Sequence, residues 1–183
     1  MSTDTLVFRS NSADKAPGKG VHEFVANVAD YAELATIKNF RRYLSNFDSS
    51  VTFTWQGPFD RPYTYRSIEH AFHAAKIYLA NPTEALKFTV ESGHSIGAGD
   101  GIVARKHRKL VKLTEEQLAL WDSQAWDVMA SVATAKFTQN PTSVPSRVLK
   151  ATGGAKLVHL ATARGKPSEL IHFSHLESIR KLI

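Results

Sequence analysis

Residues 63–77 read YTYRSIEHAFHAAKI, and this run decides the expected architecture because it joins a short strand to a helix. Ser67 is a favourable N-cap, so the helix should begin immediately after it. At about 100° per residue, the apolar side chains after this cap share one face. They are Ile68, Ala71, Phe72, Ala75 and Leu79. The run therefore predicts an amphipathic helix with one apolar stripe.

Glu69 and Lys76 lie at the edge of this stripe, with His73 close to them. The pair is separated by seven positions, which places the two side chains within about 20° of each other around the helix. Along the axis they are roughly 10 Å apart, so they can converge on a small group between them. Two interpretations follow: a reactive carboxylate and amine, or the solvated shoulder that amphipathic helices usually have.

The rest of the chain adds short strands and further helices. Residues 51–55 alternate in polarity and are rich in β-branched and aromatic side chains, which is typical of a strand. Residues 21–28 are a candidate first strand. Thr114 and Gln117 form a capping box that opens a long helix, and Pro167 should start a final helix. We expect an α+β fold, a helix-rich single compact domain with a few short strands.

Size and composition indicate an ordinary globular protein. The chain has 183 residues, of which 43% are hydrophobic and 22% are charged. These values fit one domain with a sizeable core. Residues 1–20 are polar and should form a flexible lead-in, which leaves residues 21–183 as the domain. We expect this domain to be a monomer.

Composition also restricts the location and the chemistry. The chain has no cysteine, which excludes a disulfide framework, a thiolate nucleophile and a thiolate metal site. No run reaches the length of a membrane span, and the start lacks the basic and apolar regions of a secretory signal. We expect a protein without membrane attachment that works inside the cell, in the cytoplasm or the nucleus.

The positive charge of the chain favours polyanionic partners. Lysine and arginine number 23 against 17 acidic residues, which gives a formal net charge of +6. Such an excess suits nucleic acids or phosphate-bearing ligands. The densest cluster is Arg-Lys-His-Arg-Lys at residues 105–109, and Arg105 is its candidate phosphate contact. The alternative is that this cluster is a solvated helix face.

Several short motifs follow one another from about residue 22 to about residue 160. LSNF at residues 44–47 precedes Tyr65-x-Ser67-x-Glu69-His70 and Lys76. Further matches lie at Trp121, at residues 128–129, at residues 135–141, at residues 149–152 and at residues 156–158. In this order the motifs resemble the signature of the NADAR (YbiA-like) family. The resemblance implies a YbiA-like fold.

The resemblance also implies N-glycosidase chemistry on ADP-ribose and related nucleotides, without a cofactor. The bond that breaks joins a ribose anomeric carbon to a base nitrogen. Positive charge develops on that carbon, so Glu69 is a candidate to stabilise it or to activate water. An amine at an apolar border loses its proton more readily, which makes Lys76 a candidate nucleophile that forms a Schiff base with the ring-opened sugar. The alternative for Lys76 is a cationic anchor for a ribose hydroxyl or a phosphate.

Other matching positions supply candidate substrate contacts. Asn46 can hydrogen-bond ribose hydroxyls or a base edge, or it can be a turn residue that bonds its own backbone. Phe47, Tyr65 and Trp121 can stack on a base, although aromatic side chains more often belong to a core. His73 is the candidate acid or base. No spacing of His, Asp and Glu residues indicates a metal site.

One segment departs from the family pattern. Members commonly carry a WGDG-like segment before the last helix, whereas residues 160–167 read LATARGKP and the next acid is Glu169. This departure argues against an activity on riboflavin-pathway intermediates and against a mechanism with two carboxylates. We therefore expect a glycohydrolase that removes ADP-ribose from guanine bases of DNA or RNA. The alternatives are an N-glycosidase of a free phosphoribosyl or ADP-ribosyl small molecule, and a non-catalytic module that binds ADP-ribose or nucleic acid.

Overall fold

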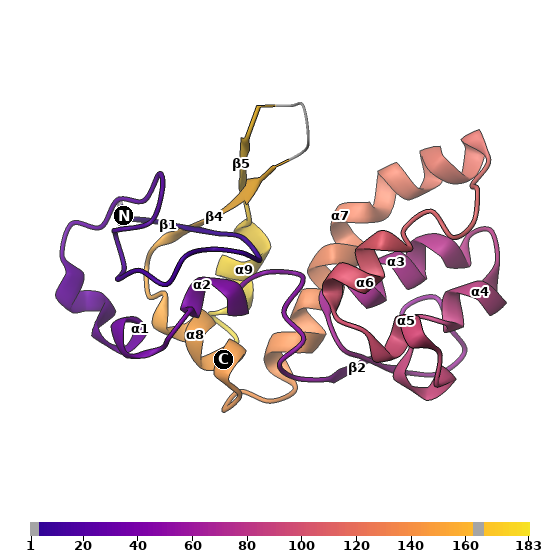
Figure 1. Cartoon of the computed structure of the whole chain (residues 1–183), viewed down its shortest axis with the longest axis horizontal. Coiled ribbons are helices and arrows are strands. Elements are labelled where there is room, and N and C mark those ends of the chain that lie inside the picture. Colours follow the sequence, from indigo (N-terminus) through magenta and orange to yellow (C-terminus); the bar gives the residue numbers. More distant parts are fainter. Residues whose placement is uncertain (1–3, 163–166) are drawn as a thin grey trace. The chain divides into compact units, whose positions relative to one another are not determined.

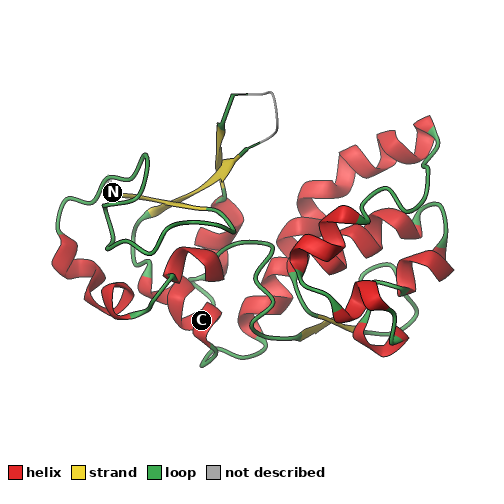
Figure 2. Ribbon diagram, viewed as in Figure 1, coloured by secondary structure: helices red, strands yellow, loops and turns green. Residues whose placement is uncertain are grey.

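The computed structural model describes residues 4–162 and 167–183, and the chain forms two compact units (Figure 1). Unit 1 combines Met1–Ser45 with Asn140–Ile183, and unit 2 is the intervening stretch Asn46–Gln139. Both units contain helices and short strands, and helix is the main component (Figure 2). The helix-rich α+β class predicted from the sequence is therefore confirmed.

Unit 1 is built on a three-stranded sheet with the order β1-β4-β5. The strand β1 (Thr5–Phe8) runs parallel to β4 (Lys156–Ala161), and β5 (Glu169–His172) runs antiparallel on the other side of β4. The helical segments of this unit are η1 (Val28–Tyr31), α1 (Ala32–Thr36), α2 (Phe40–Tyr43), α8 (Val144–Ala151) and α9 (Ser174–Ile179). The helix α2 contacts β1 and α8, and α9 contacts β4, and the large apolar side chains of β1 and β4 are buried, whereas Leu170 of β5 is exposed.

Unit 2 is centred on α3 (Ile68–Tyr78), which packs against three helices of the same unit (Figure 1). These are α4 (Pro82–Leu86), α6 (Gly101–Lys106) and α7 (Glu115–Thr138). An antiparallel pair, β2 (Phe53–Trp55) and β3 (Tyr63–Tyr65), precedes α3, while η2 (Val90–Ser92) and α5 (Ser95–Ala98) lie between α4 and α6. Because helices surround α3, its buried surface is wider than the single stripe predicted from the sequence.

Local sequence signals predicted the starts of α3 and α7 correctly. The hydroxyl of Ser67 accepts a hydrogen bond from the third amide after it, so α3 begins as expected. Thr114 and Gln117 make both hydrogen bonds of a capping box at the start of α7. Asn81 caps α4, with Pro82 in the first turn. Each of these caps is made within four residues of sequence, which is why the local pattern was sufficient.

Three segments of unit 1 differ from the expectation. Thr5–Phe8 lies in the stretch expected to be a flexible lead-in, yet it forms β1 and most of its side chains are buried. The strand expected over residues 21–28 is wrong, because Phe24 forms just an isolated bridge to β1. The helix expected from Pro167 is also wrong, because β5 forms first and α9 begins at Ser174. Pairing with β4 decides two of these outcomes: β1 pairs with it from far away in sequence, and β5 pairs with it as the next strand along the chain.

Candidate functional site

The predicted catalytic carboxylate, Glu69, lies in the first turn of α3 and is held from two directions. Its amide donates to the carbonyl of Asn46 at 3.0 Å, which ties the start of the helix to the preceding loop. Its side chain is only 5% exposed, and Oε2 accepts a hydrogen bond from Nε2 of His73 at 2.8 Å. Because His73 follows one helical turn later, the two side chains share a face. The predicted proximity of Glu69 and His73 is thus confirmed.

His73 is placed to orient the carboxylate. An ionised carboxylate only accepts hydrogen bonds, so the proton of a neutral His73 ring lies on Nε2. The other ring nitrogen, Nδ1, is buried and has no hydrogen-bond partner among the described residues. The ring centroids of Phe72 and Phe88 lie 5.6 and 6.5 Å from that of His73. These contacts restrict the imidazole and therefore the direction of the carboxylate.

Arg105 of α6 brings a cation next to this pair. Its Nη1 lies 3.9 Å from Oε2 of Glu69 and its side chain is 53% exposed, so the guanidinium links the buried carboxylate to the surface of the unit. The helix α6 comes close to the Phe47 backbone because Gly101, at the point of contact, has no side chain. A Cβ at Gly101 would lie 2.5 Å from Cα of Phe47, so a larger residue would push α6 away.

Lys76, the predicted nucleophile, lies in the last turn of α3 and is half-buried. Its ammonium is 6.0 Å from the ring centroid of Trp121 in α7, and that ring packs edge-on against Phe72 at 4.8 Å. Among the described residues, the Lys76 ammonium forms no hydrogen bond or ion pair. Two helical turns separate it from Glu69, and the helical phase places both on one side of α3. A ligand that lies along this side can meet both groups.

A buried ion pair anchors the loop between α2 and β2. Lys136 of α7 donates to the Oδ2 of Asp48 at 2.8 Å and to the Asp48 carbonyl at 2.9 Å. Burial lowers the pKa of Lys136, and the nearby Asp48 carboxylate opposes this shift. In the same loop the Asn46 side chain donates to the Sδ of Met129 at 3.3 Å. These contacts fix the loop whose Asn46 carbonyl holds Glu69.

Two of the aromatic residues predicted to stack on a base lie in the core of unit 2. Tyr65 is fully buried, with the Phe53 and Trp55 rings 6.3 and 6.2 Å away, and burial raises the pKa of its phenol. Trp121 is only 4% exposed. This burial argues against a stacking role for either ring and makes Trp121 the surface beneath Lys76 instead. Phe47 is half-buried and stays a predicted contact.

Four charged or titratable side chains lie along or beside one side of α3, and we call this group the α3 face: Glu69, His73, Lys76 and Arg105. Glu69 and His73 are buried, whereas Lys76 is half-buried and Arg105 is half-exposed. The carboxylate can stabilise positive charge, and a guanidinium can bind phosphate with two parallel hydrogen bonds. Within residues 4–162 and 167–183, the Lys76 ammonium has no hydrogen bond or ion pair that a ligand would have to displace. A ligand with a phosphate group and a sugar carbon that becomes positive suits this combination.

Residues 4–162 and 167–183 contain neither a metal-binding cluster nor a membrane-spanning helix. In that part of the chain, no group of three or more His, Asp or Glu side chains could hold a metal ion. Its helices include none that is long and apolar enough to cross a membrane. The segment that departs from the family pattern includes residues 163–166, which lie outside the described residues.

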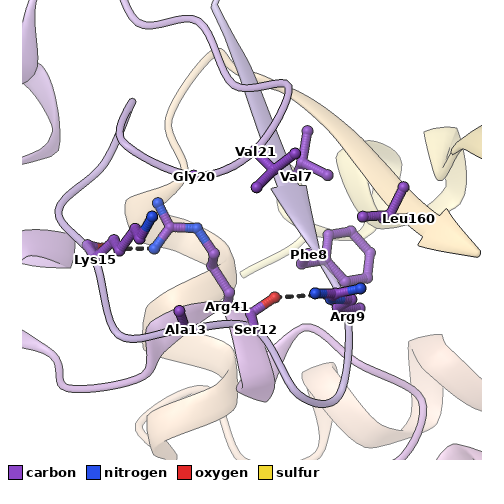
Figure 3. Close-up of a pocket in the computed structure, with 10 residues that line it drawn as sticks. All are labelled: Val7, Phe8, Arg9, Ser12, Ala13, Lys15, Gly20, Val21, Arg41 and Leu160. Carbon is purple, nitrogen blue, oxygen red and sulfur yellow. Dashed lines mark hydrogen bonds between the residues drawn. The ribbon is translucent and has the colours of Figure 1, made fainter.

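Unit 1 contains a cavity of about 70 Å³ lined by apolar and basic side chains (Figure 3). Arg41 is its buried cation, and it forms an ion pair with Glu23 at 2.6 Å. Its guanidinium also donates to the carbonyls of Lys15 and Ala16. Arginine has five N–H donors, and these contacts use most of them. Arg41 therefore stabilises the loops around the cavity, and little of its charge is available to a ligand.

Comparison with known proteins adds no relative. No protein-family model matches the chain, and no curated protein matches it either. The function is therefore argued from the geometry of the α3 face and from the motifs of the sequence.

Proposed function

We propose that the protein is an N-glycosidase that removes ADP-ribose from guanine bases of DNA or RNA. The observation that supports the proposal is the α3 face, where an oriented buried carboxylate and a half-exposed guanidinium lie next to each other. On the same side of α3 lies an ammonium that has no hydrogen bond or ion pair with the described residues. Hydrolysis of a nucleosidic C–N bond needs a group that stabilises the positive charge developing on the sugar. The phosphates of the substrate need a cation that binds them. The motif resemblance supplies the reaction, and the geometry supports it by bringing the predicted residues together.

Glu69 acts on the sugar. As the C–N bond breaks, its electron pair leaves with the guanine nitrogen and positive charge builds on the anomeric carbon. The carboxylate stabilises this charge because His73 and the surrounding core hold it in one orientation. Among the described residues, Oε1 of Glu69 accepts no hydrogen bond, so this oxygen is available to the substrate.

Lys76 acts as the nucleophile. The amine lone pair forms a bond to the anomeric carbon, and the guanine nitrogen departs with the C–N electrons and takes up a proton. The sugar ring then opens: the ring oxygen gains the proton that the lysine nitrogen loses, and a C=N bond forms. Water adds to this Schiff base and releases ADP-ribose together with the free amine. In the competing route, Glu69 takes a proton from a water molecule that attacks the anomeric carbon directly.

The test compares two substrates. The protein is incubated with an ADP-ribosylated guanine oligonucleotide and, separately, with a free ADP-ribosyl compound, and release of ADP-ribose is measured. We expect release from the oligonucleotide. Release only from the free compound would replace the nucleic acid with a small-molecule substrate, and binding without release from either would indicate the binding module.

Glu69→Gln identifies the site of that activity. The variant keeps the size of the side chain and removes its charge, so we expect the single-turnover rate to fall by about 10²–10³-fold with the fold retained. Glu116→Gln is the matched control, because Glu116 is an exposed acid of the same unit. A Glu69→Gln rate equal to that of the control would remove Glu69 from the mechanism.

A further inference from the structure

An open hollow in unit 1 gathers more positive charge than its own acids neutralise. Its volume is about 680 Å³, within the range of small-ligand sites. It lies where the end of α8, the start of β4, the end of β5 and the end of α9 meet. The cations that line it are Lys150, Lys156, Arg180 and Lys181, and the one carboxylate is that of Glu177.

The single carboxylate of the hollow is already engaged. Oε1 of Glu177 accepts the amide of Leu157 at 2.8 Å and faces Nε2 of His172 at 2.7 Å. Arg180 is engaged as well, because its Nη1 donates to the hydroxyl of Thr152 at 3.0 Å and to a carbonyl at 2.7 Å. These two side chains therefore form the wall of the hollow.

The three lysines are different. Lys150, Lys156 and Lys181 are exposed, and their ammonium groups form no hydrogen bond or ion pair with the described residues. Neighbouring like charges repel each other, and an anion that binds between them relieves this repulsion. Lysine ammonium groups are point charges that bind phosphate oxygens well.

We propose that this hollow binds neighbouring phosphate groups, as found in a nucleotide pyrophosphate or in a nucleic-acid backbone. The lysines provide the charge, and Arg180 and His172 provide polar walls. This site belongs to unit 1 and uses no residue of the α3 face, so it goes beyond the proposed function and does not depend on it.

The competing explanation is that these cations only complement helix ends. The carboxyl end of a helix is partially negative, and Lys150 in the last turn of α8 and Lys181 just after α9 suit such positions. Lys156 does not fit this explanation, because it is the first residue of the strand β4. Lys156 is therefore the position that separates the two explanations.

The experiment uses the full chain and two probes at low salt. Binding of inorganic pyrophosphate is measured by calorimetry, and binding of a labelled single-stranded oligonucleotide is measured by fluorescence anisotropy. The pocket variant carries Lys150→Gln, Lys156→Gln and Lys181→Gln. The control carries Lys15→Gln, Lys19→Gln and Lys38→Gln, which remove the same charge from exposed lysines of unit 1 outside the hollow. Thermal unfolding checks that both variants are folded.

We expect the pocket variant to bind pyrophosphate roughly tenfold more weakly and the control to stay within about twofold of the wild type. An equal loss of oligonucleotide affinity, with a shallower salt dependence, assigns the site to a nucleic-acid backbone. A loss of pyrophosphate affinity alone assigns it to a nucleotide. The single variant Lys156→Gln should account for part of the loss.

Equal binding by the pocket variant and the control would overturn the proposal, and so would a wild type that binds neither probe. The pocket variant leaves the α3 face intact, so it should release ADP-ribose from a free ADP-ribosyl compound at the wild-type rate. Failure of the glycosidase proposal is therefore distinguishable from failure of this one.

Discussion

Glu23 of unit 1 and Glu69 of unit 2 are both buried carboxylates near an arginine, but their oxygens are used differently. Three backbone amides donate to Glu23 at 2.9 to 3.0 Å, and Arg41 donates to it twice, at 2.6 and 2.7 Å. A carboxylate offers about four lone-pair sites, so Glu23 is fully occupied. It connects β1, the loop that contains Gly18 and Gly20, and the helix α2, which is a structural role.

Glu69 has much of its hydrogen-bonding capacity left. Oε2 accepts one hydrogen bond, from His73, and the nearest guanidinium nitrogen of Arg105 lies 3.9 Å away. The side chain is nevertheless almost as buried as that of Glu23. A buried charge without a full set of partners is costly, and such a group is more useful to a ligand than to the fold. Glu23 and Glu69 are therefore distinguished by the number of hydrogen bonds that their carboxylates accept, and not by their burial.

The same substitution in both units tests this comparison most strongly. Glu23→Gln removes the charge that holds Arg41 and leaves a buried cation without its counter-ion. We expect the free energy of unfolding to fall by about 3–5 kcal/mol. Glu69→Gln loses one hydrogen bond to a charged group at most, so its loss should stay below about 2 kcal/mol. Urea unfolding followed by circular dichroism measures both.

Equal losses in the two variants would break the comparison. A greater loss for Glu69→Gln would make Glu69 the structural residue and would remove the reason to assign it to a substrate. The activity assay on the same preparations then shows which of the two carboxylates the reaction needs.

Buried histidines extend the comparison to pH. Burial lowers the pKa of His175 in unit 1 from 6.5 to about 4. In unit 2, His70 faces the Ser67 hydroxyl at 2.7 Å and the Ile96 carbonyl at 3.0 Å, and burial lowers its pKa as well. As the pH falls from about 6.5 towards 4, the unfolded chain binds protons that the folded protein does not. The contribution of these histidines to the free energy of unfolding is therefore fully present above pH 6.5 and is lost on acidification.

His175→Phe measures the contribution of unit 1. The wild type should lose up to about 3 kcal/mol through His175 between pH 6.5 and 4, and the variant should lose that much less. Urea unfolding at several pH values gives the slope for each protein. Identical slopes would mean that His175 takes up its proton as readily in the folded protein as in the unfolded chain.

Two routes are open at the α3 face. In one, the Lys76 nitrogen attacks the anomeric carbon; in the other, a water molecule activated by Glu69 attacks it. Lys76→Arg keeps the positive charge and removes the nucleophile, so we expect a rate loss of at least about a hundredfold. Borohydride in the presence of ADP-ribose should trap an adduct on the wild type, visible by intact mass and mapped to Lys76. A fully active Lys76→Arg variant without any trapped adduct would leave Lys76 as an anchor and Glu69 as the base for water.

Much of unit 2 was predictable because its signals are local. The Ser67 cap and the capping box at Thr114 lie within a few residues of the helices they start. Helical phase alone placed Glu69, His73 and Lys76 on one side of α3. By contrast, β1 owes its existence to pairing with β4, far away in sequence, and no local pattern contains that information. The strand β5 pairs with β4 close by in sequence, but Pro167 was interpreted as a helix start.

The rest of the site depends on tertiary packing. Arg105 reaches Glu69 because Gly101 allows α6 to pack on Phe47. A single glycine in the sequence does not predict such a contact. Lys136 was part of a recognised motif, but its partner Asp48 lies 88 positions away. Aromatic residues give no sequence signal that separates a core ring from an exposed one, so Tyr65 and Trp121 were assigned to the substrate.

The smallest expected effect concerns Arg105, which marks the outer limit of the α3 face. If its half-exposed guanidinium binds a phosphate of the nucleic acid, Arg105→Ala should make the salt dependence of oligonucleotide binding shallower by about 0.7 in log–log slope. Lys106→Ala is the matched control, because it removes an adjacent exposed charge of α6 that makes no contact with Glu69. Its slope should stay that of the wild type. Equal slopes for both variants would mean that Arg105 only balances the charge of Glu69, and the phosphate contact would have to lie elsewhere.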